Sequence, residues 1–195
     1  MRSSEKFELF LILSMILIIF SYYFFRKKVK RDYKNYLKLT PLSCTLEILL
    51  FAFHANLAYL ILNTKWPNLP PPSKNILLKI LCLILFFTGI LILLIGWLTL
   101  GIKTSLGKDN SKLIRAGIYH YSRNPQLIGY GLILLSFVIL YFNFLMIIWF
   151  LQYLIISHFM IKTEEEFLHS KHGNVYKEYF KSVPRFFKIK KFLFK

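Results

Sequence analysis

The chain has 195 residues, of which 56% are hydrophobic and 18% are charged, and its net charge is +17. A soluble domain is usually about half apolar and about a quarter charged, so this composition argues against an ordinary soluble protein. The Lys and Arg residues gather between apolar runs, which indicates membrane topology and gives no reason to expect a nucleic acid as partner.

Five apolar runs predict an all-α, polytopic membrane protein, because a segment in lipid must satisfy its backbone hydrogen bonds internally. They cover about Phe7–Phe25, Leu42–Leu62, Ile76–Leu98, Leu127–Phe142 and Phe144–Ile161. The last two are short and meet at Asn143, so we expect a tight helical hairpin whose members need not each cross the ~30 Å hydrocarbon core. The first run is not expected to be a signal peptide, because its basic cluster follows it.

Positive charge is concentrated in Arg26–Lys38, in Gly101–Asn124 and in the tail from Lys162, whereas the proline-rich segment Asn63–Asn75 has only two lysines. The positive-inside rule places the three basic segments in the cytoplasm. With five spans, the N-terminus is then outside and the C-terminus cytoplasmic. Topology alone accounts for most of these charges, and the basic end Lys188–Lys195 also suits an anionic leaflet surface.

A first polar pattern, Gly117-x-Tyr119-x-x-x-Arg123-Asn124-Pro125, directly precedes the fourth run. Pro125 fits the first turn of a helix, whose free N–H groups can bind a carboxylate, with Arg123 adding a permanent positive charge. The alternative is a plain helix start with Arg123 among the lipid headgroups. Asn124 can hydrogen-bond a ligand but does not titrate near neutral pH, so it is not expected to be a general base. Farther along, Gly129 and Gly131 are expected to let helices approach closely.

A second polar pattern follows the fifth run: Glu164-Glu165-Glu166, then Gly173-x-x-Tyr176-x-x-Tyr179, then Val183-Pro184-Arg185. Carboxylates near a bilayer edge are costly unless they are paired or hydrated. These three can hold the amino group of a cofactor, pair with Arg123 or Arg185, cap a cytoplasmic helix, or form a solvated acidic turn. Tyr176 belongs to a helix expected to lie along the interface, either in the site or as an anchor. Arg185 can close the site from the tail.

Together the two patterns resemble the isoprenylcysteine carboxyl methyltransferase and phospholipid methyltransferase superfamily of integral membrane enzymes. The resemblance covers roughly Gly96–Phe186, and it departs from the superfamily pattern at Leu127 and His172. It implies S-adenosylmethionine as methyl donor, bound on the cytoplasmic side between the last two helices and the C-terminal segment. It implies cofactor binding by Tyr119, Arg123, Asn124, Pro125, Glu164, Glu165 and Tyr176, and catalytic roles for Arg123, Glu165 and Arg185.

These observations divide the chain into a membrane scaffold at residues 1–95 and a catalytic half at residues 96–195. The acceptor is expected to be lipid-soluble or membrane-embedded, resembling either an isoprenylcysteine carboxylate or a phospholipid amine. A carboxylate needs no base, whereas an amine must be neutral, and Glu165 is placed to take its proton. No Cys/His pair has metal-ligand spacing, so no metal is expected.

Two other functions remain open. A membrane sterol reductase using NADPH has a similar helical half and an Arg-x-Pro pattern, but it usually carries Asn-Tyr after the proline, where this chain has Gln126-Leu127. A non-catalytic lipid-binding protein of the same fold is the other alternative. In the second apolar run, Glu47 and His54 lie on similar helix faces and are either functional or paired structurally with a neighbouring helix.

Overall fold

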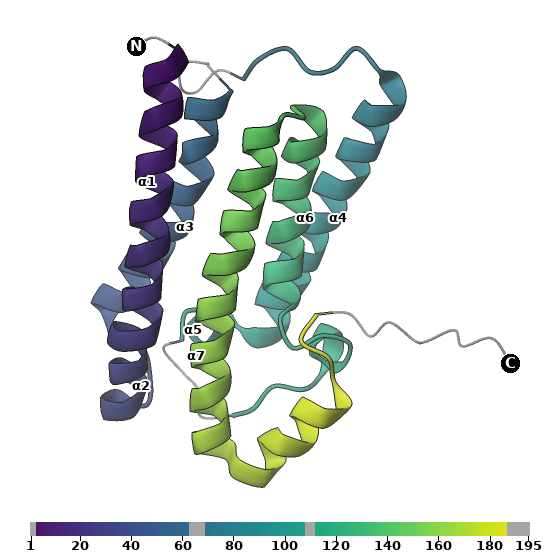
Figure 1. Cartoon of the computed structure of the whole chain (residues 1–195). Coiled ribbons are helices and arrows are strands. Elements are labelled where there is room, and N and C mark those ends of the chain that lie inside the picture. The colour runs from purple at the N-terminus through teal and green to yellow at the C-terminus, as the bar shows by residue number, and fades with distance from the viewer. Residues whose placement is uncertain (1–2, 63–68, 108–111, 187–195) are drawn as a thin grey trace, which may run out of the picture.

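The computed structural model describes residues 3–62, 69–107 and 112–186, and all the secondary structure of these residues is helical (Figure 1). The helices are α1 (Ser3–Tyr23), α2 (Lys30–Tyr36), α3 (Pro41–Ile61), α4 (Ile76–Leu100), α5 (Ile102–Ser105), α6 (Pro125–Leu140) and α7 (Phe144–Ser182). A π-helical segment at Phe24–Val29 joins α1 to α2, and a 3-10 turn forms at Gly117–His120.

Four of the helical segments are long and apolar enough to cross a membrane: the α1–α2 unit, α3, α4 and α7. The fifth, α6, has 16 residues, or about 24 Å at 1.5 Å per residue, which is shorter than the ~30 Å core. The predicted all-α polytopic class is therefore confirmed, and so is the shortness of the fourth run. Helix α2, α5 and the last turns of α7 lie at one end of the bundle, and the start of α4 lies at the other (Figure 1).

Two helices continue beyond the predicted apolar runs. The first run was expected to stop near Phe25, but the helix continues through the basic residues to Tyr36 and ends where Leu37 takes a positive φ of 56°. The fifth run was expected to stop near Ile161, but α7 continues to Ser182, with a bend at Gly173. The apolar runs mark the membrane spans and not the helix ends: Lys, Arg and Glu are good helix formers, so both helices leave the lipid without ending.

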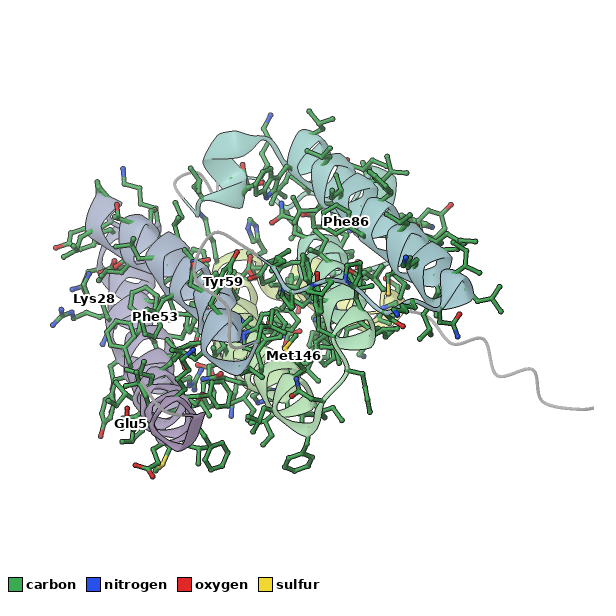
Figure 2. The ribbon with its side chains drawn as sticks, turned by 90° about the horizontal axis from the view of Figure 1, so that it is seen from above. Glu5, Lys28, Phe53, Tyr59, Phe86 and Met146 are labelled. Atoms are coloured by element: carbon green, nitrogen blue, oxygen red, sulfur yellow. The ribbon has the colours of Figure 1, made fainter. Side chains whose placement is uncertain are left out.

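The bundle has its centre in the first half of α7. Seen from above, α1 and α3 lie on one side and α4 on the other, with α6 and α7 between them (Figure 2). Met146, Trp149 and Ile156 of α7 are fully or almost fully buried, as is Phe10 of α1. Helix α7 is therefore the element that joins the N-terminal helices to the rest of the bundle.

Helices α4 and α6 approach each other closely through glycine. A Cβ atom at Gly129 would lie 2.6 Å from the carbonyl oxygen of Gly89 and 2.7 Å from the backbone nitrogen of Leu93. Gly131 faces the ring of Tyr153 on α7, where a Cβ atom would lie 3.2 Å from Cε1. The expectation that Gly129 and Gly131 serve helix packing is confirmed, because a side chain at either position would meet the neighbouring helix.

Polar contacts fasten α3 to its neighbours. His54 Nε2 donates to the carbonyl oxygen of Trp149 at 3.0 Å, Trp149 Nε1 donates to that of His54 at 2.7 Å, and the two rings stack. Of the two roles left open for His54, these contacts support the structural one. At the start of α3, Asp32 accepts hydrogen bonds from Thr40 and Ser43 and pairs with Lys28 at 2.7 Å. These contacts fix α3, and with it Glu47, against α2 and α7.

Candidate active site

A cavity opens at the end of the bundle where α2, α5 and the second half of α7 meet. The space between its walls measures about 1040 Å³, part of it open to solvent. One wall is mainly apolar and comes from the N-terminal segments, with Phe25, Val29, Tyr33 and Leu39. The other wall is mainly polar and comes from the loop before α6 and from α7. The cavity therefore draws on both halves of the chain.

The loop before α6 brings Tyr119 to the polar wall. The loop turns at Gly117, whose φ is +58° and whose Cβ would lie 3.1 Å from Thr99 Cγ2, so glycine suits this position on both counts. Tyr179 Oη donates to the carbonyl oxygen of Tyr119 at 2.7 Å, which ties the loop to α7. Burial, with the nearby Glu164 as a further cause, raises the pKa of the Tyr119 phenol, so it is a neutral group at physiological pH.

Glu165 is held between two arginines. Arg123 Nη1 lies 2.8 Å from Glu165 Oε1, while Arg185 donates from Nε to Oε1 at 3.1 Å and from Nη2 to Oε2 at 2.5 Å. Arg123 and Glu165 are mostly buried, and Arg185 is partly exposed. Pairing with Arg123 or Arg185 was one of several possibilities for the acidic run, and the structure contains both pairs.

The C-terminal segment is attached to the loop through its backbone. The Arg123 backbone N–H donates to the Pro184 carbonyl oxygen at 3.0 Å, and Asn124 Nδ2 donates to the Arg185 carbonyl oxygen at 2.9 Å. Pro125 occupies the first turn of α6, as predicted, and it is fully buried. The Asn124 side chain thus holds the C-terminal segment in place, and Arg185 reaches the site although it lies 61 residues farther along the chain.

Arg123 has one unsatisfied donor. Its Nη1 also donates to Tyr176 Oη at 3.4 Å, and its guanidinium lies over the Phe180 ring at 4.0 Å from the centroid. Its Nε atom is buried and has no hydrogen-bond partner among the described residues. A buried donor without a partner costs free energy, and this one belongs to a side chain that lines the cavity. Tyr176 and Tyr179 are buried in protein, which argues against their being interface anchors.

Two further carboxyl groups line the cavity. Glu164 comes from α7, and Glu47 comes from α3. They are close enough to interact electrostatically, and neither has an ion pair or hydrogen bond within the part of the chain that the structure describes. Lys112 also lines the cavity, but it is exposed and pairs with neither of them.

Glu166 lies outside the cavity. It pairs with Arg26 and Lys30 at 2.8 Å each, and so fastens α7 to the end of the α1–α2 unit. The possibility that the acidic run caps a separate helix is wrong, because these residues lie in the middle of α7. The three neighbouring glutamates consequently face three different environments.

Six of the predicted site residues line this one cavity: Tyr119, Arg123, Asn124, Glu164, Glu165 and Tyr176. Pro125 and Arg185 are not among the lining residues, and they adjoin it through Asn124 and Glu165. Sequence reasoning did not foresee that Tyr33 and Leu39 would form part of the wall. It left the role of Glu47 open between function and structural pairing, although an ionisable residue inside an apolar run is a signal of a functional site. The basic end Lys188–Lys195 lies outside the described residues.

Comparison with known proteins gives one result that bears on function. The model of a family described as phospholipid methyltransferase matches residues 77–175. This range contains all of α4 but its first residue, the loop with Tyr119 and Arg123, α6 and the part of α7 with Glu164 and Glu165. None of the curated proteins and none of the solved structures compared with the chain matches it.

Proposed function

The chain belongs to the phospholipid methyltransferase family of membrane proteins, and we propose that it transfers a methyl group from S-adenosylmethionine to a lipid-soluble or membrane-embedded acceptor. The observation that carries this proposal is the cavity. Its polar wall is made of the residues of the two family-like patterns, and its other wall is mainly apolar. A site of this kind receives a water-soluble donor on one side and a lipid on the other.

The residues present suit the methyl donor. Its carboxylate needs a cationic or N–H donor, and the buried Nε of Arg123 is such a donor. Its amino group needs an acceptor, which Glu164 can supply from the same wall. Tyr119 and Tyr176 line the cavity together with these charged groups. When bound, the donor supplies an electrophilic methyl group on a sulfonium.

The protein's own contribution is mainly positioning and exclusion of water. Glu165 holds Arg123 and Arg185 in fixed orientations, and the tail Val183–Arg185 covers the loop that carries Arg123. Fixing two reactants in line contributes several kcal/mol through proximity. Arg123 touches the donor, while Glu165 and Arg185 hold the Arg123 side chain in its orientation. Residues 96–195 supply most of the polar side chains of the cavity, and residues 1–95 add Phe25, Val29 and Leu39 to its apolar lining.

The acceptor enters from the leaflet. Phe25, Val29 and Leu39 form an apolar wall beside the membrane-spanning helices, which is suited to acyl or prenyl chains. The proposal covers an isoprenylcysteine carboxylate and a phospholipid amine alike. The cavity also lies at the end of the bundle that carries the basic residues of α2, which the positive-inside rule assigns to the cytoplasm (Figure 1). We therefore place the site and the C-terminus on the cytoplasmic side and the N-terminus outside.

Calorimetry of the purified protein tests the proposal directly. We expect S-adenosylhomocysteine to bind and NADPH not to bind. Binding of NADPH alone would favour a reductase, and binding of neither ligand would favour a non-catalytic lipid-binding protein. Either result would overturn the proposal.

Arg123→Lys tests the assigned role, because Lys cannot reproduce the planar guanidinium that meets Glu165 and the donor. We expect weaker S-adenosylmethionine binding and lower transfer of tritiated methyl to a membrane extract, with partial rescue at excess donor. The matched control is Arg115→Lys, since Arg115 is an exposed arginine of the same loop that does not line the cavity. Equal activity in both variants would reduce Arg123 to a helix-end anchor.

A further inference from the structure

Two carboxyl groups in the cavity lack the compensating cations that Glu165 has. Glu165 is compensated by two guanidinium groups, whereas Glu47 and Glu164 face the same space without a cationic partner among the described residues. Carboxyl groups at a bilayer edge are costly unless they are paired or hydrated, so this pair creates a demand for a positive charge in the cavity.

One positive charge does not satisfy both groups. Glu164 adjoins Glu165 on α7 and belongs to the polar wall, where the donor's amino group is proposed to lie. Glu47 comes from α3, beside Tyr33, Leu39 and the apolar wall along which the acceptor enters. It also lies outside residues 77–175, the part of the chain that matches the family. Its partner is therefore to be sought on the acceptor.

Glu165 is poorly suited to take a proton from an acceptor. Both of its oxygens are occupied by guanidinium N–H donors, at 2.8 Å from Arg123 and 2.5 Å from Arg185. Glu47 carries no such contact, so its lone pairs are free to accept a proton. The base assigned to Glu165 from the sequence is thus better supplied by a residue of the N-terminal half.

We propose that Glu47 is the acceptor-side residue of the site, selecting an amine headgroup and taking its proton before methyl transfer. This inference rests on the proposed methyltransferase function. A carboxylate acceptor would meet the Glu47 carboxylate and be repelled. An ammonium group would pair with Glu47 and be placed next to the polar wall.

The step balances in atoms and charge. The ammonium gives one proton to the Glu47 carboxylate and becomes a neutral amine with a free lone pair. A nitrogen–carbon bond to the methyl group then forms as the sulfur–carbon bond breaks. The nitrogen becomes positively charged and the sulfonium becomes a neutral thioether. The proton on Glu47 leaves to water through the open side of the cavity.

The test uses the full-length protein in vesicles containing either dioleoylphosphatidylethanolamine or N-acetyl-S-farnesylcysteine, with tritiated S-adenosylmethionine. We expect methylation of the amine lipid and little of the carboxylate. Glu47→Gln should lower kcat with the amine lipid by about 10²-fold or more, the usual contribution of a general base. Glu47→Asp should restore part of it. The matched control is Glu178→Gln, an exposed position of α7 outside the cavity, which should be unaffected.

Calorimetry separates this inference from the proposed function. The Glu47→Gln variant should bind S-adenosylmethionine and S-adenosylhomocysteine as the wild type does, which also shows that it is folded. Loss of donor affinity in this variant would assign Glu47 to the donor and overturn the inference. So would methylation of the farnesylcysteine alone, or of neither acceptor, in a wild type that binds the donor. A wild type that binds no donor would overturn the proposed function itself.

Discussion

Replacing Glu165 by Gln removes the charge that two guanidinium groups share while keeping the size of the side chain. The side chains of Arg123 and Glu165 are only 7% and 12% exposed, so this pair is shielded from water. Breaking a buried ion pair by removing one partner costs about 3–5 kcal/mol, because the remaining charge stays buried. The Arg185 side chain is 34% exposed and can be hydrated when Glu165 is replaced, so losing its pair with Glu165 adds little to the loss of stability. We expect Glu165→Gln to lower the free energy of unfolding by about 3 kcal/mol or more.

The adjacent residue provides a matched control. Glu166 also meets two cations, Arg26 and Lys30, but it is 36% exposed and Lys30 is 55% exposed. Exposed pairs of this kind contribute about 0–1 kcal/mol, so Glu166→Gln should change stability little. Both variants are to be unfolded in the same detergent, with and without S-adenosylhomocysteine. Equal losses of stability in the two variants would refute the reasoning from burial.

The same variant also tests the site. If Glu165 orients Arg123 toward the donor, Glu165→Gln should weaken S-adenosylmethionine binding by roughly 1.5–3 kcal/mol, the range for a hydrogen bond to a charged group. That is roughly a ten- to hundred-fold change in Kd. Unchanged affinity in a folded variant would remove Glu165 from the cofactor site.

Three further predictions concern the scaffold. Gly129→Ala should destabilise the bundle by about 1–3 kcal/mol, because its Cβ would lie 2.6 Å from a backbone oxygen of α4; unaltered thermal unfolding would contradict this. His54→Ala should lower the free energy of unfolding by about 1–3 kcal/mol, because the hydrogen bond to Trp149 and the ring stacking are lost, while donor affinity is retained. A selective loss of donor affinity would instead give His54 a functional role. Cysteine labelling in intact cells should reach Asn68→Cys from outside and not Lys195→Cys, and labelling of the latter would invert the proposed topology.

Local sequence was enough to predict the class of the protein and the starts of several helices. Apolar runs placed α3, α4 and α6 to within a few residues, and Pro125 marked the first turn of α6. The two polar patterns supplied most of the cavity's polar wall. These features depend on hydropathy and on the geometry of single residues, which are fixed by nearest neighbours in the chain.

Other features depended on contacts between distant segments. The sequence allowed four roles for Glu164, Glu165 and Glu166, and only the folded chain decides among them. Helix α7 turns Glu166 toward Arg26 and Glu165 toward Arg123, while Glu164 faces the cavity. A helix rotates by about 100° per residue, so consecutive residues face different neighbours, and those neighbours come from segments up to 140 residues away.

The sequence by itself determined that this is an all-helical membrane protein with two polar patterns beside its last spans. The tertiary structure alone decided that Glu47 shares a cavity with them. Hydropathy marks Glu47 as unusual, but its partners depend on how α3 is set against α2 and α7, which is fixed by Asp32 and by the contact between His54 and Trp149. The sequence shows that a charged residue lies in an apolar span, where it is unfavourable. Which group offsets this unfavourable free energy depends on how the helices pack against each other.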